Sequence, residues 1–241
     1  MLIVDPKNAR ACGTRLPTCP EHKRSRRDAL RAMLGFGAAM LATGLSSARA
    51  AEAMRGFTAI EHLGPFYPVT KPEDRDDDLT LVKGQPARAE GEVLYVSGRV
   101  LNMRGEPVRG AKLEVWQANA KGRYINAADR NPAPLDPNFQ GYTRLVTNAE
   151  GRYAFKTIKP GAYPTPKPGW VRPPHIHFDI TGNVSRLTTA LYFDGEPYND
   201  GDLVLQTSWA RETQIVKLGG ARSTQEPQAL TAEWDIVLIG G

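Results

Sequence analysis

Two histidines one residue apart are the clearest chemical feature of the sequence. His175 and His177 lie in an apolar stretch, Trp170-Val171-Arg172-Pro173-Pro174-His175-Ile176-His177-Phe178, and the chain has only four histidines in all. Residues two apart in a β-strand project from the same face, so the two imidazoles would point together. Neutral imidazole is a common metal ligand, and such a pair could hold a metal ion. The alternative is a pair of half-buried histidines satisfied by hydrogen bonds.

Two tyrosines in turn-like segments could add oxygen donors to such a site. Tyr124 follows Lys121-Gly122-Arg123, and Tyr163 follows a Pro-Gly turn. Taken alone, each tyrosine is better explained as a packing residue with a hydrogen-bonded hydroxyl. Both cysteines of the chain, Cys12 and Cys19, precede residue 50, so any metal site in the rest of the chain must use nitrogen and oxygen donors.

Arg172 is the third chemically suggestive residue of the histidine stretch. Strict strand alternation would place it on the face opposite His175. Pro173-Pro174, however, favours polyproline II geometry with three residues per turn, which returns residue 172 to the side of residue 175. The sequence therefore predicts a guanidinium that faces the possible metal pocket, with a surface salt bridge as the structural alternative.

The elements that must position these residues are short strands separated by Gly, Pro and Asn turns. Asn148-Ala149-Glu150-Gly151 between two of the strands is a hairpin signal. No long amphipathic helix is evident, so the pattern predicts an all-β, antiparallel β-sandwich with long loops. The predicted strands are 93–100, 112–117, 144–147, 152–158, 175–181, 187–193 and 233–239.

Three connecting segments stand out from this strand pattern. Residues 57–68 end in Gly64-Pro65-Phe66-Tyr67-Pro68 and should be extended. Residues 71–78 are highly charged and should form a solvated loop. The interval 118–142 is too long for a simple connection, and loops of that length in a compact domain are usually functional.

The basic character of the chain belongs to its N-terminal part. Residues 1–50 hold nine of the 31 Lys and Arg residues and three of the 26 acids, so residues 51–241 carry 22 basic and 23 acidic side chains, a net charge of −1. The excess of basic residues is therefore no evidence that the folded part binds nucleic acid.

The N-terminal part is predicted to be an export signal. A basic segment that contains Ser25-Arg26-Arg27 precedes an apolar run over 32–45 and the small-residue site Ala48-Arg49-Ala50. The apolar run is short and interrupted by glycine, which argues against a membrane span. The arginine pair resembles the twin-arginine type of signal, so we expect export to the periplasm or beyond. An ordinary secretory signal or an uncleaved anchor is the alternative.

Several separated motifs together resemble the intradiol ring-cleavage dioxygenases, in particular the β-chain type that acts on protocatechuate. The resemblance covers about residues 57–240. The motifs that carry it occur in the family's order: Gly122-Arg123-Tyr124, Ala133-Pro134-Leu135-Asp136-Pro137-Asn138-Phe139, Thr157-Ile158-Lys159-Pro160-Gly161-Ala162-Tyr163-Pro164, Arg172-Pro173-Pro174-His175-Ile176-His177-Phe178, Leu191-Tyr192-Phe193 and Trp234-Asp235-Ile236-Val237-Leu238.

The resemblance implies a β-sandwich that holds one non-haem Fe(III). Carried over by motif, the iron ligands would be Tyr124, Tyr163, His175 and His177. A tyrosine with an ordinary pKa of about 10 ionises at neutral pH only beside a strong positive charge, which a trivalent metal supplies. The predicted organisation is a signal peptide over 1–50, an N-terminal arm over 51–90 and a catalytic domain over 91–241.

The implied reaction opens a small aromatic diol with O2 between its two hydroxyl-bearing carbons, giving a cis,cis-muconate-type diacid. Tyr163 would leave the metal and take up a substrate proton, and Arg172 would stabilise negative charge on the substrate. No nucleic acid takes part, and the mature form is expected to have no membrane span.

Departures from the family pattern limit what can be said of the substrate. Thr165 stands where the protocatechuate enzymes have a large aromatic residue, and Ala190 where they have glutamine. Together with Tyr67, these residues are the predicted substrate pocket, which could admit a different and larger catechol. Gly64-Pro65-Phe66-Tyr67 resembles a segment that an unlike partner chain contributes in that enzyme, so a homo-oligomer or a self-sufficient subunit is possible.

Two other functions fit parts of the sequence. His62, His175 and His177 could form a three-histidine zinc or copper site, in which the tyrosines would be dispensable. A secreted, non-catalytic β-sandwich that binds carbohydrate or protein is the second, because this architecture hosts many functions.

Overall fold

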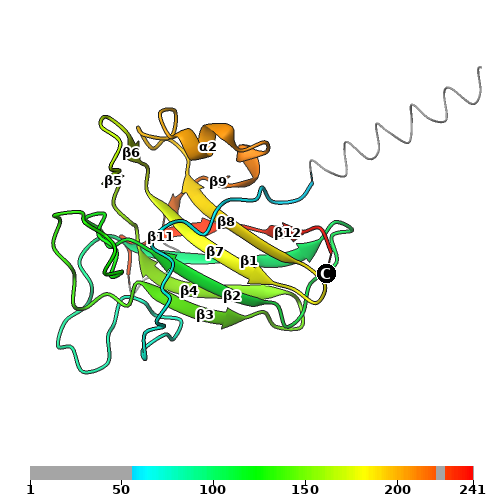
Figure 1. Cartoon of the computed structure of the whole chain (residues 1–241). Coiled ribbons are helices and arrows are strands. Elements are labelled where there is room, and N and C mark those ends of the chain that lie inside the picture. Colours follow the sequence, from blue (N-terminus) through cyan, green and yellow to red (C-terminus); the bar gives the residue numbers. More distant parts are fainter. Residues whose placement is uncertain (1–55, 221–225, 241) are drawn as a thin grey trace, which may run out of the picture. The chain divides into compact units, whose positions relative to one another are not determined.

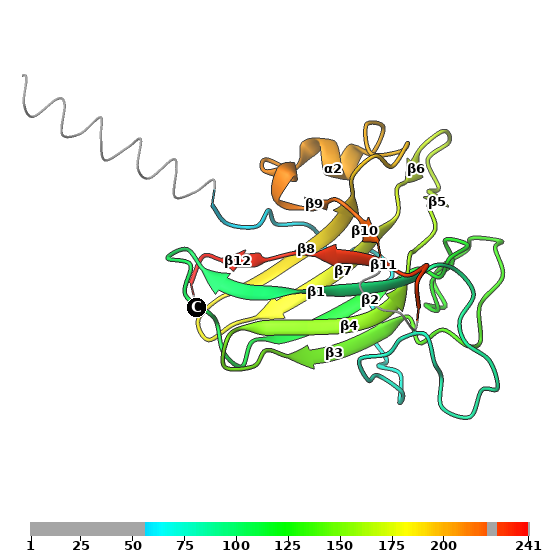
Figure 2. The same cartoon turned by 180° about the vertical axis from the view of Figure 1, so that it is seen from behind.

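The fold consists of two five-stranded β-sheets and a small two-stranded sheet, shown from opposite sides in Figures 1 and 2. The computed structural model describes residues 56–220 and 226–240. The predicted signal peptide over 1–50 and the start of the predicted arm lie outside the described residues. The described part confirms the prediction of an all-β sandwich, and its one α-helix, α2 (Leu203–Thr207), has five residues.

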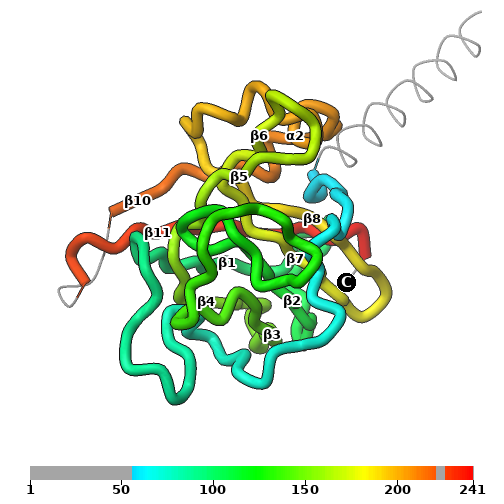
Figure 3. Tube along the Cα trace, turned by 60° about the vertical axis from the view of Figure 1, so that its left-hand side comes forward, coloured from blue at the N-terminus to red at the C-terminus, as the bar shows by residue number. Residues whose placement is uncertain are grey.

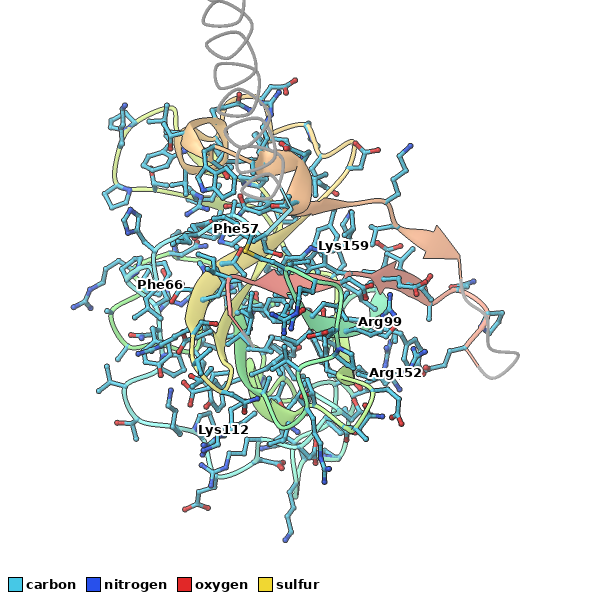
Figure 4. The ribbon with its side chains drawn as sticks, turned by 90° about the vertical axis from the view of Figure 1, so that its right-hand side faces the viewer. Phe57, Phe66, Arg99, Lys112, Arg152 and Lys159 are labelled. Atoms are coloured by element: carbon cyan, nitrogen blue, oxygen red, sulfur yellow. The ribbon has the colours of Figure 1, made fainter. Side chains whose placement is uncertain are left out.

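The first sheet is built around its longest strand, β1 (Val93–Asn102). On one side β1 pairs antiparallel with β4 (Arg152–Ile158), so that Arg99 lies opposite Arg152, as Figure 4 labels them. On the other side it pairs with β11 (Leu230–Glu233) and then with β12 (Ile236–Leu238), both parallel. The short β10 (Gly219–Gly220) extends the sheet beyond β11.

The second sheet carries the histidine stretch on an inner strand. Its order is β3 (Tyr142–Val146), β2 (Lys112–Gln117), β7 (His175–Thr181), β8 (Arg186–Phe193) and β9 (Ile215–Val216). All its pairs are antiparallel except β8 with β9. The two-stranded sheet, β5 (Tyr163–Pro164) with β6 (Val171–Arg172), leads directly into β7.

The main hydrophobic core is formed by alternate residues of the two large sheets. On β7 these are Ile176, Phe178 and Ile180, each 0% exposed, and on β2 they are Leu113 and Val115. The first sheet supplies Leu94, Val96 and Phe155 among others. Because side chains alternate along a strand, this packing turns the intervening residues of β7 and β2 away from the core.

The predicted hairpin over 144–158 is wrong, although its turn is present. The backbone N–H of Gly151 donates to the Asn148 carbonyl at 3.1 Å, which closes the turn. The two flanking strands then separate, because β3 pairs with β2 in one sheet and β4 pairs with β1 in the other. A turn signal between two strands does not reveal whether they share a sheet, and here the connection crosses the sandwich.

The predicted strand 233–239 is also wrong in its bounds, since the structure divides it into β11 and β12. At the break the Trp234 N–H donates to Ser97 O, and the Asp235 carboxylate accepts from the backbone N–H of Arg99. Both segments pair parallel with the same strand, so the sandwich is antiparallel only in part. No helix in residues 56–220 and 226–240 is long and apolar enough to span a bilayer.

Candidate metal centre

The histidine pair lies on the outer face of the second sheet rather than in the main core. Because Ile176 and Phe178 face the core, His175 and His177 point away from it, as the strand alternation predicted. Both histidines are nevertheless buried, with 2% and 3% of their surfaces exposed. Other segments must therefore cover this face of the sheet.

Three segments cover the histidines. The N-terminal arm, whose residues Phe57 and Phe66 are labelled in Figure 4, is held on β8 by the Glu61 N–H, which donates to Thr188 O at 2.8 Å. The loop over 118–141 carries Tyr124, and the β5–β6 hairpin carries Tyr163. The hairpin lies beside α2, as Figure 3 shows. The site is thus assembled from regions distant in sequence.

The structure brings the four predicted ligands together. The Nε2 atoms of His175 and His177 lie 3.1 Å apart, and the Tyr163 hydroxyl lies 3.5 Å from His175 Nε2. The Tyr124 ring meets the Tyr163 ring edge-on at 5.4 Å between centroids and lies 6.3 Å from the His177 ring. Two imidazoles and two phenols therefore converge at one place on the outer face of the sheet.

Two glycines allow the two tyrosine-bearing turns to interlock. Gly122 has a positive φ of 77°, and a Cβ on it would lie 2.3 Å from the Ala162 carbonyl oxygen. A Cβ on Gly161 would lie 2.4 Å from Ala120 O. The Gly161 N–H also donates to Asn119 O at 2.9 Å. Each tyrosine follows its glycine by two residues, so this close backbone contact sets their relative position.

We expect Gly122→Ala to cost more than its backbone conformation alone explains. Positive φ costs a non-glycine residue about 1–2 kcal/mol, and the contact with Ala162 adds an overpacking cost of about 1–3 kcal/mol. Gly169→Ala is the matched control, because Gly169 has the same φ of 77° and nothing within 4 Å of its Cβ position. Urea unfolding of both variants measures the difference, and equal losses would contradict the interlocking role of Gly122.

The donor set leaves polar atoms without protein partners. The His175 Nδ1 atom lies 2.7 Å from the Pro173 carbonyl oxygen, which can only accept, so this nitrogen carries the proton and Nε2 presents its lone pair. The buried Tyr124 hydroxyl and His177 Nδ1 have no hydrogen-bond partner among the described residues. The unpartnered Tyr124 oxygen beside the converging Nε2 atoms fits a bound cation with nitrogen and oxygen ligands, whereas His177 Nδ1 lies on the other side of its ring and would not face that cation.

Burial favours the neutral form of all four groups. It raises the pKa of Tyr124 well above its ordinary value, with repulsion from Tyr163 added, and raises the pKa of Tyr163 despite the opposing effect of Arg172. Burial and Arg172 lower the pKa of His177 to about 3, and the pKa of His175 is also far below its ordinary value. The histidines are therefore ready to bind a metal, whereas the phenols need a cation to ionise.

We expect the metal-free protein to lose stability on acidification. Between an ordinary histidine pKa of 6.5 and about 3, the unfolded chain binds a proton at residue 177 that the folded protein excludes. This contribution is complete above pH 6.5 and decreases by about 1.4 kcal/mol per pH unit below it. The free energy of unfolding of the chelator-treated wild type and of His177→Gln, measured at pH 7.5, 6.0 and 5.0, isolates the effect. If both proteins lost the same stability as the pH fell, this role of His177 would be contradicted.

Arg172 lies in a buried network that joins three elements. Its Nε is 2.7 Å from Asp202 Oδ2, and its NH2 group donates to the Tyr192 hydroxyl at 2.6 Å and to Glu61 at 3.3 Å. Tyr192 in turn donates to Glu61 at 2.9 Å and stacks on the His175 ring. Gln214 Nε2 also donates to Glu61, at 3.2 Å. Arg172 lies on β6 directly opposite Tyr163, so the β5–β6 hairpin brings it to the site.

Sequence reasoning missed four members of this network: Glu61, Tyr192, Asp202 and Gln214. Tyr192 stood in a quoted motif without an assigned role. Asp202 precedes an apolar run as a helix-capping residue does, and its carboxylate accepts from the Leu205 N–H at 2.8 Å. Nothing in the sequence near Glu61 indicates an arginine partner 111 residues away.

A cleft of about 330 Å³ opens beside the converging side chains. This volume is at the lower end of the range for small-molecule sites, which suits a single aromatic ring. Tyr163, Arg172 and His177 line it together with the predicted pocket residue Thr165. Its other lining residues are Glu61, His62, Gly64, Pro65, Phe66, Pro164, Pro166, Trp170 and Val204.

Two predicted pocket residues are not among those that line this cleft. Tyr67 turns to the opposite side, where its hydroxyl donates to Glu114 and its ring meets Trp116 edge-on at 5.0 Å. Trp116 in turn stacks on His177 at 4.9 Å, so Tyr67 supports the site from behind. Ala190 is 0% exposed and packs with Tyr192 and Leu205.

The three-histidine alternative lacks the required arrangement. His62 is exposed on the cleft wall, whereas His175 and His177 are buried. Within the described ranges, no three His, Cys, Asp or Glu side chains are grouped so as to hold a metal. The Tyr163 hydroxyl, which that alternative makes dispensable, lies 3.5 Å from His175 Nε2.

Comparison with known proteins places this arrangement in a family. Residues 63–240 match the family model described as "Dioxygenase". The chain is 46% identical over 184 residues to the protocatechuate 3,4-dioxygenase beta chain of Burkholderia cepacia, covering 75% of this chain and 74% of that one. It is 30% identical over 177 residues to hydroxyquinol 1,2-dioxygenase of Rhizobium sp. (strain MTP-10005), covering 68% of this chain and 57% of the relative.

Solved structures show the same fold. The dioxygenase domain of a carbohydrate-binding fusion protein from Streptomyces sp. SirexAA-E aligns with a TM-score of 0.56 at 27% identity, covering 77% of this chain and 99% of that domain. Catechol 1,2-dioxygenase from Pseudomonas arvilla C-1 aligns with a TM-score of 0.61 at 26% identity, covering 86% of this chain and 70% of that one. The chain therefore belongs to the intradiol ring-cleavage dioxygenase family.

Proposed function

We propose that the chain is a non-haem Fe(III) enzyme that cleaves a 1,2-dihydroxybenzene with O2 to a cis,cis-muconate-type diacid. The convergence of Tyr124, Tyr163, His175 and His177 beside a ring-sized cleft carries this proposal. Family membership and the relatives named for protocatechuate and hydroxyquinol support it.

The four converging side chains would hold the iron. Two phenolates offset most of the charge of a trivalent ion, and two neutral imidazoles complete a hard, mixed nitrogen and oxygen donor set. Fe(III) held there would supply the Lewis-acid and redox chemistry that makes the ring of the diol reactive towards O2. Trp116, stacked on His177, and the Pro173 carbonyl, which accepts from His175, would keep the imidazoles in orientation.

Two residues would assist the diol as it binds. The Tyr163 oxygen, as a phenolate, would accept one of the two substrate protons and become a neutral phenol, because burial raises its pKa and favours the protonated form. The guanidinium of Arg172, which lines the cleft, would stabilise negative charge that develops on the substrate. Both residues belong to the same hairpin, where they lie directly opposite each other.

O2 consumption by this chain alone, loaded with Fe(III), tests the proposal. Catechol, protocatechuate and hydroxyquinol are the three probes, and formation of a ring-opened diacid from at least one is the expected result. An iron-loaded, folded protein that consumes no O2 with any of them would favour the non-catalytic binding module instead. The experiment also tests self-sufficiency, because Gly64, Pro65 and Phe66 of this chain already line its cleft.

We also propose that the protein is exported by the twin-arginine route, on the basis of Ser25-Arg26-Arg27 and the apolar run after it. Cell fractionation of a bacterial host that expresses the full chain is the measurement. We expect Arg26→Lys with Arg27→Lys to retain the full-length protein in the cytoplasm. Unchanged export of that double variant would contradict the twin-arginine route.

A further inference from the structure

The cleft beside the converging ligands offers little to a substrate that carries a negative charge on its ring. Most of its wall is apolar, with Phe66, Pro164, Pro166, Trp170 and Val204 as its larger members. Arg172 is the one Lys or Arg side chain among the described residues that line it. Recognition of a ring carboxylate in this cleft would therefore depend on Arg172.

The charge of Arg172 is already balanced by carboxylates. Its Nε lies 2.7 Å from Asp202 and its NH2 group 3.3 Å from Glu61. With both carboxylates ionised, the cluster has a net charge of −1, and with Glu61 protonated it is neutral. In neither state does the cluster carry a net positive charge, so Arg172 offers local hydrogen-bond donors but no net charge that would offset removal of a ring carboxylate, a third carboxylate in the cluster, from water.

The Glu61 carboxylate is fixed on the wall of the cleft. Its Oε2 accepts from the Tyr192 hydroxyl at 2.9 Å and from Gln214 Nε2 at 3.2 Å, and its backbone N–H donates to Thr188. Only 9% of the residue is exposed. Because these contacts come from β8 and the segment before β9, Glu61 cannot turn away from a bound ring without breaking them.

We propose that the cleft selects catechols without an anionic ring substituent and that Glu61 is the specificity-determining residue that rejects a ring carboxylate. This inference rests on the proposed function and refines its substrate class. It differs from the expectation set by the 46% identical relative, which is named for protocatechuate, a catechol with a ring carboxylate. A like charge close to a partly desolvated carboxylate discriminates strongly, because little water screens it.

The test compares two diols of the same shape and different charge. Protocatechuate and 3,4-dihydroxybenzamide differ only in a carboxylate against an uncharged carboxamide. With the Fe(III)-loaded protein we expect kcat/KM for the amide to exceed that for protocatechuate at least about ten-fold. Anaerobic titration gives the Kd of each diol, so the preference for the amide can be measured even if the protein does not turn either diol over. Equal or better use of protocatechuate would overturn the proposal.

Variants assign the effect to Glu61. Glu61→Gln should reduce the preference for the amide at least about five-fold, whereas Glu61→Asp, which keeps the charge, should retain it. Glu114→Gln is the matched control, because Glu114 is held by Tyr67 and Tyr142 behind Trp116 and does not line the cleft. An unchanged preference in folded Glu61→Gln would overturn the role of Glu61. Absence of O2 consumption with all diols, despite discrimination in binding, would count against the proposed function alone.

Discussion

Replacing Tyr124 by phenylalanine is expected to slow catalysis strongly while making the metal-free protein more stable. The ferric wild-type protein should be red-brown from tyrosinate-to-iron charge transfer, and Tyr124→Phe and Tyr163→Phe should each weaken or shift that absorption. Loss of an anionic ligand should lower kcat at least about 10²-fold. Visible spectra and O2 consumption of the iron-loaded variants are the measurements.

The stability part of this prediction follows from the unpartnered hydroxyl. Tyr124 is 2% exposed and its hydroxyl has no partner among the described residues, so removing the oxygen relieves a buried unsatisfied group. The metal-free variant should gain about 1 kcal/mol in the free energy of unfolding. Tyr153→Phe is the control: its buried hydroxyl donates to Trp234 O at 2.8 Å in the sandwich, so this variant should lose about 1 kcal/mol and keep the colour.

The opposite signs separate a metal ligand from a packing residue. If Tyr124 were a structural tyrosine, both variants would lose stability and the iron-loaded protein would keep its spectrum. An unchanged colour in both Tyr124→Phe and Tyr163→Phe, or a colourless iron-loaded wild type, would rule out the tyrosinate ligands.

Replacing Arg172 by methionine is expected to damage both stability and turnover. The change leaves Asp202, which is 0% exposed, and Glu61 without their cation. Removing one partner from a buried ion pair costs about 3–5 kcal/mol, because an uncompensated charge remains. Loss of a positioned cation beside the substrate should also lower kcat by about 10²–10³-fold. Urea unfolding and steady-state O2 consumption measure the two effects.

A second substitution distinguishes the ion pair from simple packing. Asp202→Asn retains the cap of α2, since asparagine caps a helix as well as aspartate does, but removes the charge that Arg172 balances. In the double variant with Arg172→Met, the two losses should be less than additive by at least about 1 kcal/mol. Additive losses, or a single-variant loss below about 1 kcal/mol, would show that the pair contributes little.

Local patterns of the sequence predicted most of the strands correctly. β1, β2, β4, β7 and β8 lie within a few residues of their predicted positions, because alternation, β-branched residues and Gly or Asn turns act over short distances. The prediction of a hairpin over 144–158 is wrong because the turn residues act locally, whereas the choice of partner strand depends on the whole sandwich.

The sequence by itself determined the chemistry that the site can offer. Two histidines two residues apart on a strand, two tyrosines each two residues after a glycine, and no cysteine beyond residue 19 leave nitrogen and phenol oxygen donors. That conclusion needs only residue types and the period of a strand. The family motifs then indicated which tyrosines belong with the histidines.

Only the tertiary structure decided how this chemistry is enclosed. The covering of the outer face by the arm, the neutralisation of Arg172 by Glu61 and Asp202, and the absence of Tyr67 and Ala190 from the lining of the cleft depend on contacts between distant segments. Glu61 and Arg172 are 111 residues apart, and no local pattern encodes their meeting. Burial and charge balance are properties of the assembled site, and they set both the pKa values of its ligands and the charge that its cleft can accept.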